Sequence, residues 1–171
     1  MGRAGRLAFG HGWHALGPFP LVFPVLTEEN GPAVAAARNS GKRLLTNQEW
    51  QAAALGTPDG APCNVSSGSV AVTGTAGCVS DVGAFDMVGN LSEMVADWVP
   101  RSTACPDYTF TILGDTNDQM CLAGADTTIG PGVLFRGGAF NYGAAAGVFA
   151  VNGFLTPWSA GTFYIGFRAA R

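Results

Sequence analysis

The sequence predicts an α+β fold, in which helices come first along the chain and strands come last. Two helical signals lie within residues 27–55, and a long stretch rich in Gly, Ser, Thr and Pro follows them. Apolar, β-prone pieces then appear at Leu134–Arg136 and Ile165–Phe167. Helices and strands that are segregated along the chain, rather than alternating, are typical of the α+β class. With 171 residues, the chain suits one domain that can bury a proper core.

Each predicted helix has recognisable boundaries. Thr27, followed by two glutamates, begins the first helix, which continues through residues 32–38 (PAVAAAR) and ends near Gly41. The second helix begins at Thr46, because Thr46 and Glu49 form the pattern of a capping box, in which each side chain satisfies a free backbone amide. We expect this helix to stop at Gly56.

Four cysteines lie in two local pairs within the loop-like parts of the chain. None has CxxC spacing, so a zinc knuckle is not expected. Of the three connectivities, the local one, Cys63–Cys78 with Cys105–Cys121, is the prediction. Each bridge would close a loop of roughly 15 residues and contribute about 3 kcal/mol in the chain-entropy account. Four reduced thiols remain the alternative from sequence alone.

Composition excludes several classes of function. Charged residues make up only 12% of the chain and the formal net charge is −3, so a nucleic-acid ligand is not expected. The longest apolar run, near residues 19–26, is interrupted by two prolines and is too short to span a membrane. The basic start of the chain lacks the apolar h-region of a signal peptide, so none is predicted.

The last third of the chain is chemically unusual. About 25 residues, from Phe140 to Tyr164, contain no Asp, Glu, Lys, Arg, His or Cys. The segment therefore lacks the acids, bases and nucleophiles of ordinary hydrolytic or transfer chemistry. It does combine aromatic side chains with small residues, as contact surfaces do. A buried β-core is the alternative interpretation.

Three motifs, taken in order, resemble the formylglycine-generating enzyme (sulfatase-modifying-factor) family. These are Gly41–Trp50 (GKRLLTNQEW), Phe85–Met94 (FDMVGNLSEM), and Arg136–Phe140 (RGGAF) with Ile165–Arg168 (IGFR). The resemblance covers residues 25–171 and implies a C-type-lectin-like fold of that enzyme's type, with two helices packed on a small antiparallel sheet and long loops. Residues 1–24 are then an irregular lead-in.

The enzymes of that family carry a catalytic cysteine pair between RGGSW and GFR, and this chain has no cysteine there. Copper-thiolate chemistry needs soft sulfur ligands, so we expect no enzymatic activity and no required cofactor. The chain is more similar to the variable proteins of diversity-generating retroelements, whose C-terminal repeat resembles residues 136–168. In such repeats the Asn codons of a template are mutagenised. Residues 136–168 are therefore expected to be a variable ligand-binding segment.

That resemblance implies a set of specificity-bearing side chains on a fixed backbone. They are Phe140, Asn141, Tyr142, Ala144, Ala145, Asn152, Phe154, Leu155, Ser159, Thr162, Phe163 and Tyr164. Some of them, Phe140 above all, could instead be core residues.

The second motif also resembles a calcium loop of the enzyme family. The ligands would be the carboxylates of Asp86 and Glu93 with the backbone carbonyls of Gly89 and Leu91. Hard oxygen ligands of this kind suit calcium. The alternative is a turn in which both carboxylates cap backbone amides.

The sequence thus predicts a non-catalytic protein that binds a protein or cell-surface ligand, such as a host receptor, and whose specificity is varied by retroelement mutagenesis. A place on a virion or cell surface fits this interpretation, although a cytoplasmic place is open, as is homo-oligomerisation. The alternatives are an oxidoreductase similar to the formylglycine-generating enzymes and a structural, tail-type assembly subunit.

Overall fold

A computed structural model describes residues 31–105, 117–126, 128, 130–157 and 163–171. The predicted lead-in, residues 1–24, and the predicted helix start at Thr27 lie outside the described residues. In order, the elements are α1 (Pro32–Asn39), β1 (Arg43–Leu44), α2 (Asn47–Ala54), β2 (Ser92–Val99), β3 (Met120–Cys121), β4 (Gly132–Arg136), the 3-10 turn η1 (Gly143–Ala145), β5 (Val151–Asn152), β6 (Ile165–Phe167) and β7 (Ala169–Ala170).

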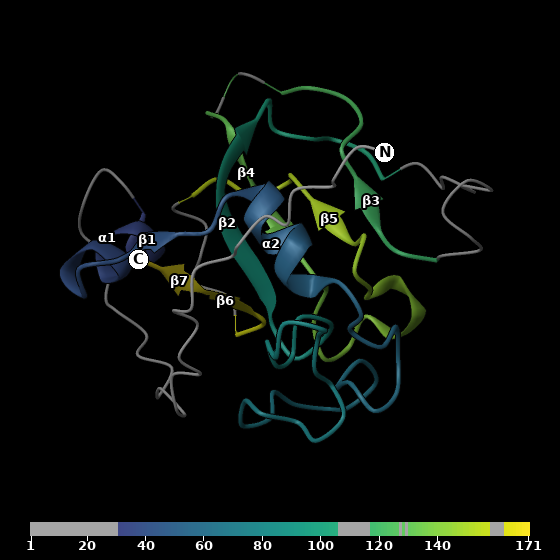
Figure 1. Cartoon of the computed structure of the whole chain (residues 1–171). Coiled ribbons are helices and arrows are strands. Elements are labelled where there is room, and N and C mark those ends of the chain that lie inside the picture. The colour runs from purple at the N-terminus through teal and green to yellow at the C-terminus, as the bar shows by residue number, and fades with distance from the viewer. Residues whose placement is uncertain (1–30, 106–116, 127, 129, 158–162) are drawn as a thin grey trace, which may run out of the picture.

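The strands form a five-stranded sheet in the order β3-β5-β4-β2-β6 and a separate pair, β1-β7 (Figure 1). The contacts of β4 with β2 and with β5 are antiparallel, as predicted. The pairs β2-β6 and β3-β5 are parallel, so the sheet is mixed rather than purely antiparallel. Pairing of β7 with β1 brings the end of the chain beside the segment that joins the two helices.

The two helices cover opposite faces of the sheet, and the alternation of side chains along β2 and β4 makes this possible. Val95 and Leu134 pack in one apolar cluster with Trp50 of α2. Their neighbours Met94 and Phe135 point to the other face and pack in the cluster that contains α1. Burying both faces explains why β4 is buried along its whole length.

The second helix confirms its predicted start. The backbone N–H of Glu49 donates to the Thr46 hydroxyl at 3.2 Å, and the Glu49 carboxylate accepts the Thr46 N–H at 2.9 Å. The first helix continues to Asn39, close to its expected end. Both predicted helices are therefore present, and the local capping chemistry accounts for where the second one begins.

Disulfides pin the long loops. Cys63 bonds to Cys78, and Cys105 bonds to Cys121, which is the predicted local connectivity. Cys63 and Cys78 also belong to a third apolar cluster, with Val65, Val88 and Ala146, beneath the loop of residues 57–83. In the part of the chain that the structure describes, no helix is long and apolar enough to cross a bilayer.

Candidate ligand-binding face

The predicted variable segment begins at Arg136, which fastens it to the scaffold. The guanidinium Nε donates to the Ala150 carbonyl at 3.0 Å, and Nη2 donates to the Val148 carbonyl at 2.9 Å. The same guanidinium donates to the side-chain oxygens of Asn47 and Gln51 on α2. Burial lowers the pKa of Arg136 to about 10. This arginine therefore acts as an internal clamp between the segment and α2.

The far end of the segment is fastened in the same region. The Nε atom of Arg168 donates to the Glu93 carboxylate at 2.6 Å, and the Trp50 indole N–H donates to the same carboxylate at 2.8 Å. The guanidinium of Arg136 lies over the Trp50 ring, 4.7 Å from its centroid. The motifs singled out in the sequence therefore meet at one cluster, which we call the anchor cluster. It consists of the buried residues Trp50, Glu93 and Arg136 and the partly exposed Arg168.

Two glycines after Arg136 are required by close backbone approach. Gly137 and Gly138 have φ of 82° and 74°, in the left-handed region. A Cβ at Gly137 would lie 2.5 Å from the Met87 carbonyl oxygen, and one at Gly138 would lie 2.7 Å from Cα of Ala146. The RGG motif is thus a geometric requirement of the scaffold rather than part of a contact surface.

Between these fixed points, the described candidate residues differ in exposure. Asn141, Ala144 and Phe163 are exposed, and Phe163 keeps 67% of its surface. Six further candidates are half-buried, namely Tyr142, Ala145, Asn152, Phe154, Leu155 and Tyr164. Ser159 and Thr162 lie outside the described residues.

The expectation that Phe140 is a contact residue is wrong. It retains only 4% of its surface, so it is a core residue and not a free contact side chain. The backbone explains the burial, because the Phe140 N–H donates to Asn90 at 3.1 Å and its carbonyl accepts from Ser67 at 2.9 Å. Both bonds draw this position into the interior.

The buried ring of Phe140 supports an aromatic patch. Its centroid lies 6.0 Å from that of Phe163, and Phe163 meets Tyr164 edge-on at 5.5 Å. Burial, and to a smaller extent the nearby Tyr164, raises the pKa of the Tyr142 hydroxyl. Residues from the two ends of the variable segment therefore come together, and Phe163 presents a rigid apolar surface of the kind that anchors interfaces.

The two carboxylates predicted as calcium ligands, Asp86 and Glu93, have protein partners instead. The Asp86 carboxylate accepts backbone N–H groups of Gly74 and Thr75, and Glu93 is held in the anchor cluster. A cation at Glu93 would have to displace Arg168. Among the described residues, no group of three or more His, Cys, Asp or Glu could hold a metal ion. This arrangement does not fit a calcium site that uses these carboxylates, and the calcium hypothesis remains an untested prediction.

The turn at residues 86–90 instead organises the neighbouring loop. Asp86 and Asn90 both have positive φ, 54° and 58°. The Asn90 side chain accepts the Ala71 N–H at 2.8 Å and donates to the Ala71 carbonyl at 3.1 Å. Together with the Asp86 bonds to Gly74 and Thr75, these contacts hold the loop in place without regular secondary structure.

Sequence reasoning missed Asp118, which is 9% exposed and supports the middle of the variable segment. One carboxylate oxygen accepts the Phe149 N–H at 2.7 Å, while the other has no hydrogen-bond partner among the described residues. A Cβ at Gly147 would lie 2.0 Å from this carboxylate. Burial, more than the nearby Asp59, raises the pKa of Asp118 to about 6. An isolated Asp in a loop-like region carries no sequence signal for this role.

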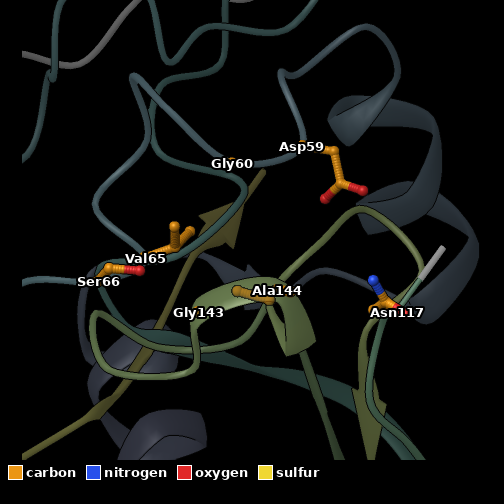
Figure 2. A pocket seen from close by; sticks show the side chains of 8 residues that line it. Asp59, Gly60, Val65, Ser66, Asn117, Gly143 and Ala144 are labelled. Carbon is orange, nitrogen blue, oxygen red and sulfur yellow. The ribbon is translucent and has the colours of Figure 1, made fainter.

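A pocket also lies beside the segment, and its members are far apart in the sequence. Its volume is about 390 Å³, and it is lined by Asp59, Gly60, Val65, Ser66, Asn117, Gly143, Ala144 and Ala146. In Figure 2, Asp59 and Asn117 lie on one side of the Gly143–Ala144 turn, and Val65 and Ser66 lie on the other. Of the predicted binding residues, only Ala144 is part of this lining.

No protein-family profile matches the chain, and no curated protein does. Solved structures do match. The M1, I1 and U1 variants of the Major Tropism Determinant superpose with TM-scores of 0.57, 0.56 and 0.54, at 21%, 21% and 23% sequence identity. The chain has the fold of the Major Tropism Determinant variants.

The superposition covers 80% of this chain and 35% of each of those chains, so the chain spans about a third of the Major Tropism Determinant length. The predicted α+β, C-type-lectin-like fold is confirmed. At these identities the likeness extends to the fold and not to individual binding residues.

Proposed function

We propose that this chain is a non-catalytic ligand-binding protein whose C-terminal segment, residues 136–168, is diversified by retroelement mutagenesis to vary its specificity. One observation carries the proposal: the segment divides into buried positions that hold its backbone and positions whose side chains are largely exposed. Arg136, Gly137 and Gly138 belong to the first kind, whereas Asn141 and Phe163 belong to the second. A backbone fixed in this way tolerates replacement of its exposed side chains.

The fold neighbours add support, because their name assigns them a role in tropism. A protein that determines tropism must discriminate among partners, and a surface that varies on a constant scaffold is suited to that task. We therefore take the ligand to be a protein or another cell-surface molecule, such as a host receptor. The aromatic patch around Phe163 is the expected anchor.

The placement of the cysteines favours binding over catalysis. All four are used in Cys63–Cys78 and Cys105–Cys121, and none lies in residues 136–168. Disulfides are typical of proteins outside the reducing cytosol, which suits a virion or cell-surface location. An oxidoreductase related to the formylglycine-generating enzymes would need free thiolates in the interval where this chain has none.

The proposal is tested with two displayed libraries. The first randomises four positions that are exposed or half-buried, Asn141, Ala144, Phe154 and Phe163. The matched control randomises four buried positions of the same part of the chain, Phe140, Ala146, Ala150 and Val151. Protease resistance measures the folded fraction of each library, and panning against two unrelated purified proteins, lysozyme and serum albumin, measures the capacity to acquire specificity.

We expect most clones of the first library and few clones of the second to stay folded. Panning should enrich different sequences for each target. If the first library unfolds as readily as the control, or if neither target enriches any clone, the segment is not a variable binding surface. A near-identical template repeat beside the gene would support the genetic part of the proposal independently.

A further inference from the structure

Three polar side chains line the pocket beside the η1 turn, and the described structure gives none of them a hydrogen-bond or ion-pair partner. Within the part of the chain that the structure describes, Asp59, Ser66 and Asn117 make no side-chain hydrogen bond or ion pair. All three are exposed and border the same cavity. Polar groups that converge on a concave surface without an internal partner are available to a ligand.

The charge of the pocket is negative. Asp59 lies at its wall, and Asn117 is followed by Asp118, one buried oxygen of which has no hydrogen-bond partner among the described residues. Burial, and to a lesser extent the like charge of the nearby Asp59, raises the pKa of Asp118. Arg136, whose charge acts on Asp118, is already hydrogen-bonded to Asn47, Gln51 and two backbone carbonyls. The lining that the structure describes therefore contains no lysine or arginine that could serve as a counter-charge.

The remaining lining is apolar and small, since it consists of Val65, Ala144, Ala146 and two glycines. A volume of about 390 Å³ lies near the lower end of the range of about 300–1,000 Å³ typical of ligand sites. A lysine or arginine side chain has an apolar stem and a cationic head, and therefore matches such a lining. Its head carries only donors, which match the oxygen acceptors of Asp59, Ser66 and Asn117.

We infer that this pocket binds the basic side chain, lysine or arginine, of a partner protein, with Asp59 as counter-ion and Asn117 and Ser66 as further acceptors. The inference rests on the proposed binding function and specifies the chemistry of the partner. Because Gly143 and Ala144 form one wall and belong to the variable segment, a larger residue at Ala144 would fill the pocket. Diversification would then decide whether a basic side chain is accepted.

The test uses the whole chain and small probes rather than an unidentified partner. Nα-acetyl-lysine methylamide and Nα-acetyl-arginine methylamide are titrated against labelled protein, and the backbone and side-chain amide signals are followed by NMR. The neutral probe is Nα-acetyl-norleucine methylamide, which keeps the apolar stem without the charge. We expect saturable shifts at Asn117, Gly143 and Ala144 with at least one basic probe and none with the neutral one.

Two variants locate the site. Asp59→Asn should weaken binding of the basic probe by about tenfold or more, since it removes one charge-assisted hydrogen bond. Ala144→Leu should abolish binding by filling the pocket. Ala52→Leu, at an exposed position on α2, is its matched control and should bind as the unmodified chain does.

Equal shifts with the norleucine probe would overturn the inference, and so would the absence of shifts with both basic probes. Unchanged binding in Asp59→Asn or Ala144→Leu would do the same. The comparison of charged and neutral probes on the unmodified chain does not depend on whether a variant folds. If the pocket fails this test while the exposed-position library still yields binders, only the pocket assignment is wrong; if the library fails, the proposed function itself is wrong.

Discussion

Replacing Glu93 with alanine should test whether the anchor cluster holds the variable segment in place. Glu93 accepts the indole N–H of Trp50 at 2.8 Å and Arg168 Nε at 2.6 Å, and its side chain is only 10% exposed. Its removal leaves the buried Trp50 N–H without a partner, which costs about 1–3 kcal/mol.

Removal also separates Arg168 from its counter-ion. Breaking a buried pair costs about 3–5 kcal/mol, but Arg168 is 28% exposed and keeps the Phe85 carbonyl as an acceptor, so its share is smaller. Together these effects should lower the free energy of unfolding by about 3 kcal/mol.

The assay is urea denaturation of Glu93→Ala, Arg168→Ala and the double variant. Since the two side chains share one interaction, the losses should be non-additive by about 1 kcal/mol or more. The matched control is Arg43→Ala. Arg43 meets Glu49 at the same 2.6 Å but at the surface, so this change should leave the stability nearly unaltered.

A loss below about 1 kcal/mol for Glu93→Ala, or additive losses in the cycle, would refute the idea that these motif residues form one structural unit. A loss in Arg43→Ala as large as that in Glu93→Ala would also refute it, because burial would then not be the cause of the difference.

Three further outcomes are expected. Gly138→Ala should destabilise the domain by about 3 kcal/mol in urea denaturation. The new Cβ would lie 2.7 Å from Cα of Ala146, and the left-handed backbone conformation is unfavourable for alanine. A change within about 0.5 kcal/mol would contradict the close approach. Burial raises the pKa of Asp118 from 3.8 to about 6, so the native state binds this proton more tightly than the unfolded chain. Its contribution to stability should therefore rise as pH falls from 7 toward 4, by at most about 3 kcal/mol, and Asp118→Asn should lack this rise in denaturation at each pH. Phe140→Ala truncates a core residue and should lower the free energy of unfolding by about 3–5 kcal/mol. Phe163→Ala should change it by less than about 0.5 kcal/mol but should weaken binding to a partner that the displayed chain recognises. Equal losses of stability in denaturation would contradict the different burial of the two rings.

Local chemistry explains which parts of the fold could be predicted without a structure. A capping box needs only Thr46 and a glutamate three residues later, and both lie within one helical turn. The local cysteine connectivity follows similarly from short separations of 15 and 16 residues, although the sequence alone left reduced thiols open. The segregation of helices and strands along the chain was enough to indicate the α+β class.

Long-range packing decided the rest. The sequence left Phe140 open as either a contact or a core residue, because both it and Phe163 are phenylalanines in an apolar segment. The structure shows that the backbone of Phe140 is hydrogen-bonded to Asn90 and Ser67 and its side chain is buried, while Phe163 remains exposed. The pocket likewise brings Asp59 and Asn117, 58 positions apart in the sequence, into one lining. The sequence by itself therefore determined the start of the second helix and the fold class, whereas the first helix begins at Pro32 rather than at the predicted Thr27. Which side chains of the variable segment face a ligand depended on contacts between distant residues, and only the tertiary structure supplies those.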